Sequence, residues 1–76
     1  MKIKDLEVGQ KAKVIKYTTT DRNYRQKLLR MGLVKGSQFK LIRIAPLGDP
    51  VEIRLKDFNL SLRKDEADAL EIEVLS

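Results

Sequence analysis

The 76-residue chain contains no cysteine and no histidine. Without cysteine it can form neither a disulfide bond nor a thiolate metal site. Without histidine it lacks the usual base of a nucleophilic catalyst, and a zinc or other soft-metal site loses its common ligands. Glycine-rich phosphate loops of the GxxxxGK[ST] or GxGxxG type are also missing. We therefore expect no catalytic residues, no cofactor and no resident metal, and a binding module rather than an enzyme.

Long apolar runs are absent as well. None approaches the roughly 20 residues that a membrane-spanning helix needs, and no hydrophobic signal segment follows the N-terminal lysines. We expect a cytoplasmic protein without a membrane span. The length predicts a single domain, residues 1–76, with one modest core.

Aromatic residues are few, which bears on the meaning of the +5 net charge. Such a charge suits nucleic acid, a membrane surface or an acidic protein, but the basic residues are spread along the chain between acids, as on a solvated surface. Small barrels bind single strands by stacking bases on exposed aromatics. Of the four aromatics, Tyr24, Phe39 and Phe58 fall on apolar faces and are expected in the core, and only Tyr17 falls on a face that the pattern does not assign. Nucleic-acid binding is therefore an alternative that the sequence disfavours.

One amphipathic helix is predicted over residues 23–31, where apolar residues recur at i, i+4 and i+7. Asp21 or Asn23 can cap its start. Gly32 suits the left-handed position that ends a helix, and Leu33 can then fold back onto the last turn.

The rest of the chain alternates apolar and polar residues with a period of two, which is typical of strands. A helical turn is expected near residues 64–69. Five short strands with one apolar face each need to curl around a core, because one short helix cannot cover them. We therefore predict a mainly β fold, a small five-stranded β-barrel. The expected strands are 11–18, 39–44, 51–56, 58–63 and 70–74.

Three carboxylates, Asp65, Glu66 and Asp68, are the remaining candidates for a hard-cation site. Acidic residues are also favoured in the first turn of a helix, where they face free backbone N–H groups. We interpret the three as the start of the helical turn.

Longer motifs carry a family resemblance. The series "YRQKLLRMGLVKGSQFKLIRIAPLGDPVEI", with "LEVGQKAKV" before it and "LSLRKDEADALEIEVL" after it, resembles the FeoA family, small cytoplasmic proteins encoded with the bacterial ferrous-iron transporter FeoB. The resemblance implies an SH3-like β-barrel. It also implies a role in ferrous-iron uptake through contact with FeoB, a membrane protein with a cytoplasmic GTPase domain, and no defined catalytic activity.

Similar domains occur in metal-dependent repressors of the diphtheria-toxin-repressor type. A metal-responsive regulatory domain is therefore a further alternative, which the lack of histidine and cysteine disfavours.

The segment APLGDP, residues 45–50, reads as a turn between two strands. Turn geometry explains its two prolines and its glycine. It does not explain Leu47, which either folds over an open end of the barrel or serves as an apolar anchor for a partner. We expect this turn, with basic residues at its base, to form part of the FeoB contact surface. The predicted contact residues are Pro46, Leu47, Gly48, Asp49, Pro50, Arg43 and Arg54.

Arg25 falls within the apolar arc of the predicted helix. Its long side chain can reach water from there. Alternatively, its guanidinium can bind Asp49 or backbone carbonyls of the turn. The second interpretation predicts that Arg25 supports the turn structurally.

Overall fold

Five short antiparallel strands form a single curved sheet in the computed structural model, which describes residues 1–75. Ser76, the last residue of the predicted domain, lies outside this range. The predicted strands and helices are confirmed to within two residues at each end. In chain order the elements are η1 (Ile3–Asp5), β1 (Lys11–Tyr17), α1 (Arg22–Arg30), β2 (Gln38–Ile44), β3 (Val51–Arg54), β4 (Asn59–Leu62), α2 (Lys64–Asp68) and β5 (Leu70–Val74). No helix in this part of the chain is long and apolar enough to span a bilayer.

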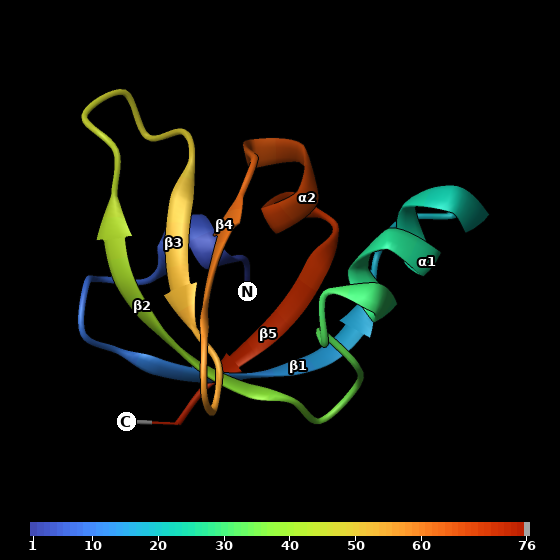
Figure 1. The fold of residues 1–76 in the computed structure, drawn as a ribbon, viewed down its shortest axis with the longest axis horizontal. Helices are drawn as coiled ribbons and strands as arrows, with labels where there is room; N and C mark the ends of the chain where they lie inside the picture. Colours follow the sequence, from blue (N-terminus) through green and yellow to red (C-terminus); the bar gives the residue numbers. More distant parts are fainter. Residues whose placement is uncertain (76) are drawn as a thin grey trace.

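The sheet has the strand order β4-β3-β2-β1-β5, so β4 and β5 are its two edges (Figure 1). These edges do not pair with each other, and α2 packs against both of them. The mainly β, five-stranded fold is confirmed, but hydrogen bonds do not close the barrel. The reason is local, because β4 has four residues and runs directly into α2, which fills the gap that a closing pair would occupy.

The core lies on the inner face of this curl. Alternate residues of each strand point inward, as the period of two predicts. Residues of η1, α1 and α2 complete it. The largest fully buried side chains are Ile3, Val14, Leu28, Leu33, Leu41, Ile53, Leu62, Leu70 and Ile72.

Helix α1 begins and ends as the sequence predicts. The carboxylate of Asp21 accepts hydrogen bonds from the backbone N–H groups of Asn23 and Tyr24. At the other end Gly32 has φ +89°, and the N–H of Leu33 donates to the carbonyl of Leu28 at 3.0 Å. This 6→1 bond satisfies a carbonyl that the helix end would leave free, and both of the leucines that it joins are buried in the core.

Tyr17 connects β1 to α1. Its hydroxyl donates to the carbonyl of Leu33 at 2.5 Å, and the guanidinium of Arg25 lies 5.7 Å from the centre of its ring. Partial burial raises the pKa of Tyr17, although the nearby Arg25 opposes this.

The prediction that Arg25 supports the APLGDP turn is wrong, because α1 lies on the opposite side of the molecule from the β2–β3 loop (Figure 1).

Two of the aromatic predictions are also wrong. Phe58 lies in the turn before β4 rather than on its inner face, and 46% of it is exposed. Its ring covers the end of α1, since a Cβ on Gly32 would lie 3.6 Å from it. Tyr24 is half-buried outside the core, so Phe39 is the only one of the three predicted core aromatics that the core contains.

Glu66 is the one buried charged residue in the described chain, at 3% exposure. One carboxylate oxygen accepts a hydrogen bond from the N–H of Arg63 at 2.8 Å, which caps α2. The other lies 2.6 Å from the ammonium of Lys27 on α1. Burial alone would raise the pKa of Glu66, but the hydrogen bonds from Lys27 and Arg63 outweigh it and hold that pKa below its ordinary value. The interpretation of the acidic residues as a helix start is confirmed for Asp65 and Glu66, which lie in the first turn of α2. It is wrong for Asp68, which is the last residue of that short helix.

We expect Glu66→Ala to lower the free energy of unfolding by about 1 kcal/mol at neutral pH, because the N–H of Arg63 loses its cap. Glu66→Gln keeps an oxygen acceptor but loses the charge. Because the folded pKa lies below 4.5, the charged form stabilises the wild type above that pH, and this contribution disappears as pH falls through the folded pKa.

Urea unfolding between neutral and acidic pH measures both effects, with the exposed Asp65→Asn as the control. The free energy of unfolding of Glu66→Gln should fall less steeply in acid than that of the wild type. An equally steep fall would show that the charge of Glu66 does not stabilise the fold.

Candidate functional site

No three His, Cys, Asp or Glu side chains among residues 1–75 come close enough to hold a metal ion. The most buried carboxylate, Glu66, is engaged in holding the two α-helices together. The candidate functional sites are surfaces suited to contact, and the β2–β3 turn is the first of them.

The turn is a defined hydrogen-bonded structure. The N–H of Gly48 donates to the carbonyl of Ala45 at 2.7 Å, and the N–H of Ala45 donates to the carbonyl of Pro50 at 3.1 Å. Gly48 has φ +85°, which side chains other than glycine rarely tolerate, although a Cβ there would meet open space. The Asp49–Pro50 peptide bond is cis. The backbone thus places residues 46 and 47 at the tip.

Asp49 ties the turn to the body of the domain. Its carboxylate accepts a hydrogen bond from the backbone N–H of Lys64 at 3.0 Å. This N–H is at the first position of α2, where a helix leaves donors free and favours a negative charge. The support that the sequence reasoning sought in Arg25 comes from Lys64 instead. The local signal was present, because any helix start offers free N–H groups, but the sequence did not show that the two segments meet.

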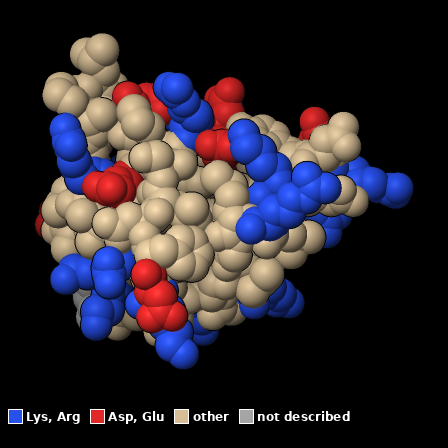
Figure 2. All heavy atoms as spheres, viewed as in Figure 1, with Lys and Arg blue, Asp and Glu red and all other residues tan. Residues whose placement is uncertain are grey.

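Leu47 is 96% exposed. The alternative in which it folds over an open end of the barrel is therefore wrong. The turn extends beyond the sheet, and its tip forms an uncharged projection in the space-filling view (upper left in Figures 1 and 2). The arrangement displays an apolar side chain on a backbone that is already ordered.

A small apolar groove lies beneath the turn, with a volume of about 120 Å³. The hairpin, η1 and α2 all contribute to it, and two lysines are among its lining residues. The sequence reasoning missed this groove, because three segments distant in the chain form it; the nearest signal was Ile44, an apolar residue directly before the turn. The lining residues are Ile3, Lys4, Ile44, Gly48, Val51, Lys64, Ala67 and Asp68.

The two arginines predicted at the base of the turn separate in the structure. Arg43 is there, in a shallow hollow that Pro50 also lines, and it pairs across the sheet with Glu52. Arg54 is not, because β3 runs away from the turn and Arg54 is its last residue. Its guanidinium donates to the side-chain oxygen of Asn59 at 3.2 Å. The predicted position of Arg54 is therefore wrong.

Comparison with known proteins identifies the family. The FeoA domain model matches residues 1–74. The Fe(2+) transport protein A/Fe(2+) transporter FeoB fusion protein of Porphyromonas gingivalis is 34% identical over all 76 residues, and the chain spans 9% of its length.

Two solved structures show the same fold. The FeoA-like protein of Clostridium acetobutylicum is 37% identical with a TM-score of 0.89, over 100% of this chain and 87% of that one. The zinc complex of Stenotrophomonas maltophilia FeoA, described as a prokaryotic SH3 domain protein, has a TM-score of 0.80 at 22% identity, over 96% of this chain and 89% of that one. The curved sheet described above is thus SH3-like, and the chain, matched along nearly its whole length, belongs to the FeoA domain family.

Proposed function

We propose that this chain is a cytoplasmic, non-enzymatic accessory protein of bacterial ferrous-iron uptake that acts by binding the transporter FeoB. The observation that carries the proposal is the fusion protein of P. gingivalis, in which a relative of this chain and FeoB form one polypeptide. A covalent link keeps two modules at high effective concentration, which benefits modules that work in contact.

The β2–β3 turn is the surface that we propose for this contact. Leu47 is nearly fully exposed at its tip, and two backbone hydrogen bonds and Asp49 hold the turn in place. An ordered turn loses little conformational entropy on docking. The apolar groove beneath it, together with Arg43 at its base, widens the area that a partner can cover. The proposed target is the cytoplasmic GTPase domain of FeoB.

Leu47→Ser should leave the midpoint of urea unfolding unchanged, because Leu47 is 96% exposed. A buried leucine would instead contribute about 1.5–3 kcal/mol to folding. Binding to the purified cytoplasmic domain of FeoB should weaken roughly tenfold or more, since an anchor of this size is buried only in the complex. Calorimetric titration measures the affinity.

The matched control is Val34→Ser, which removes another exposed apolar side chain, in the loop after α1. Normal FeoB binding by Leu47→Ser would reject the turn as the contact surface. Failure of the wild type to bind FeoB, with single-stranded nucleic acid tested in parallel, would reject the proposed function itself.

We expect the chain alone to bind no Fe²⁺ with submicromolar affinity. Iron sites of that strength usually include imidazole or thiolate ligands, which the sequence lacks. Anaerobic calorimetric titration with Fe²⁺ is the measurement. A stoichiometric tight site that Asp65→Asn/Asp68→Asn removed would show that the carboxylates of α2 bind metal after all.

A further inference from the structure

A row of like charges crosses three neighbouring strands. Lys11 of β1 lies directly opposite Lys40 of β2, which in turn lies opposite Arg54 of β3. The inward positions beside them hold Ala12, Phe39 and Ile53, so all three charges point outward. Like charges directly opposite each other on a sheet are destabilising. Folding therefore does not account for this row.

The row also lacks acidic partners. The ion pairs formed within residues 1–75 join the N-terminus to Glu71, Lys13 to Glu73 and Lys27 to Glu66. Arg54 bonds only a neutral amide, that of Asn59. Lys56, two residues beyond Arg54, adds a fourth positive charge at an open hollow of about 340 Å³. We call Lys11, Lys40, Arg54 and Lys56 the basic row.

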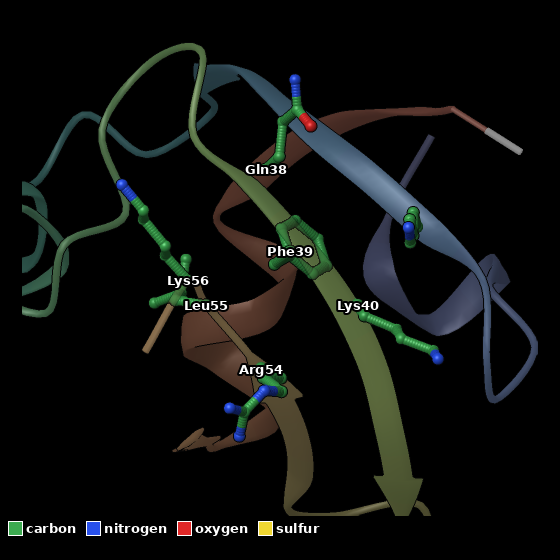
Figure 3. A pocket seen from close by; sticks show the side chains of 7 residues that line it. Gln38, Phe39, Lys40, Arg54, Leu55 and Lys56 are labelled. Atoms are coloured by element: carbon green, nitrogen blue, oxygen red, sulfur yellow. The ribbon is translucent and has the colours of Figure 1, made fainter. Parts of the chain in front are cut away.

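The side chains of the basic row diverge. Figure 3 shows Lys40 and Lys56 extending to opposite sides of Phe39, with Arg54 below them. A single compact phosphate would need donors that converge on one point, as in a backbone cradle. Diverging cations suit several separate phosphates presented on one surface, which is the arrangement in a bilayer of anionic lipids.

An exposed apolar residue lies at the β5 end of the row. The N–H of Leu75 donates to the carbonyl of Lys11 at 2.8 Å, which continues the β1–β5 register and places both residues on the outer face. Leu75 is 41% exposed there. Basic residues flanked by exposed apolar ones are typical of proteins that lie at the membrane–water interface.

We propose that the basic row binds the phosphate groups of anionic phospholipids at a membrane surface. Ammonium and guanidinium groups donate charge-assisted hydrogen bonds to phosphate oxygens. Arg54 and Lys56 lie at the end of β3 opposite the β2–β3 turn, so lipid and FeoB would contact different residues. The proposal does not rest on the proposed function, and each can fail without the other.

The test is co-sedimentation of the purified protein with vesicles of phosphatidylcholine, or of phosphatidylcholine and phosphatidylglycerol in about equal amounts. We expect binding to the mixed vesicles alone, weakening as salt is raised, because screening shortens the reach of exposed charges. Lys11→Gln/Lys40→Gln should lower the partition coefficient about thirtyfold, or about fivefold for each charge.

The control is Lys16→Gln/Lys35→Gln, which removes two exposed charges outside the row. It should bind within a few-fold of the wild type. The urea midpoint of Lys11→Gln/Lys40→Gln should equal or exceed that of the wild type, because opposed like charges are removed. A stable variant that no longer binds vesicles therefore reports a lost site rather than a lost fold.

Three results would overturn the proposal. The first is no binding to mixed vesicles at low salt. The second is an equal loss in both double variants, which would mean that only net charge matters. The third is that the same lysines bind glycerol phosphate or a single-stranded oligonucleotide more tightly than the vesicles, which would assign the row to a soluble ligand or to nucleic acid.

Discussion

The carboxylate of Glu66 holds together the side of the molecule that the sheet leaves open. The curl of the sheet brings the unpaired edges β4 and β5 to either side of α2, and Glu66 fixes that helix by capping its start and by binding Lys27 of α1. The first N–H of α2, at Lys64, in turn holds Asp49 and so anchors the β2–β3 turn. Two short contacts thus connect the buried charge of Glu66 to the turn that carries Leu47, in addition to the turn's own backbone hydrogen bonds. A buried charge is stable only when its hydrogen bonds are satisfied, which makes this arrangement sensitive to change.

The outer face of the sheet carries two regions of different chemistry, one at each end of β3. At the turn, Arg43 lies opposite Glu52 on the neighbouring strand, so the positive and negative charges at the base of the turn cancel. At the far end of β3, Lys11, Lys40 and Arg54 face one another across three strands, and none of them forms an ion pair with a carboxylate within residues 1–75. The first region suits an apolar protein contact that salt affects little, and the second suits an anionic surface. Because separate rows of the same sheet carry them, neither contact would obstruct the other.

Local patterns were enough to predict most elements, because each strand shows its buried face in its own alternation and α1 shows its caps in Asp21 and Gly32. Phe58 was a local error, because it precedes β4 instead of lying on its inner face. The other main errors concern contacts between distant segments. Arg25 was assigned to the turn, but it lies over Tyr17, because the side of the sheet on which α1 packs is not encoded in the helix itself. Arg54 was placed by its distance in sequence from the turn, although a strand of four residues carries it to the other end of the sheet. The prediction of a closed barrel was incomplete for a similar reason, because closure depends on where α2 packs relative to β4 and β5.

The size of the proposed contacts limits how such a small domain can act. Stable protein interfaces bury roughly 1,200–2,000 Å² of surface. A turn tip and one small groove offer a single short contact, so the turn alone would bind FeoB weakly. A basic row would likewise hold the chain to anionic lipid only reversibly. Two weak contacts on one rigid domain strengthen each other when their targets are adjacent, because the first contact confines the search for the second. A membrane transporter with a cytoplasmic domain places protein and lipid next to each other, and the fusion to FeoB in P. gingivalis achieves the same confinement covalently.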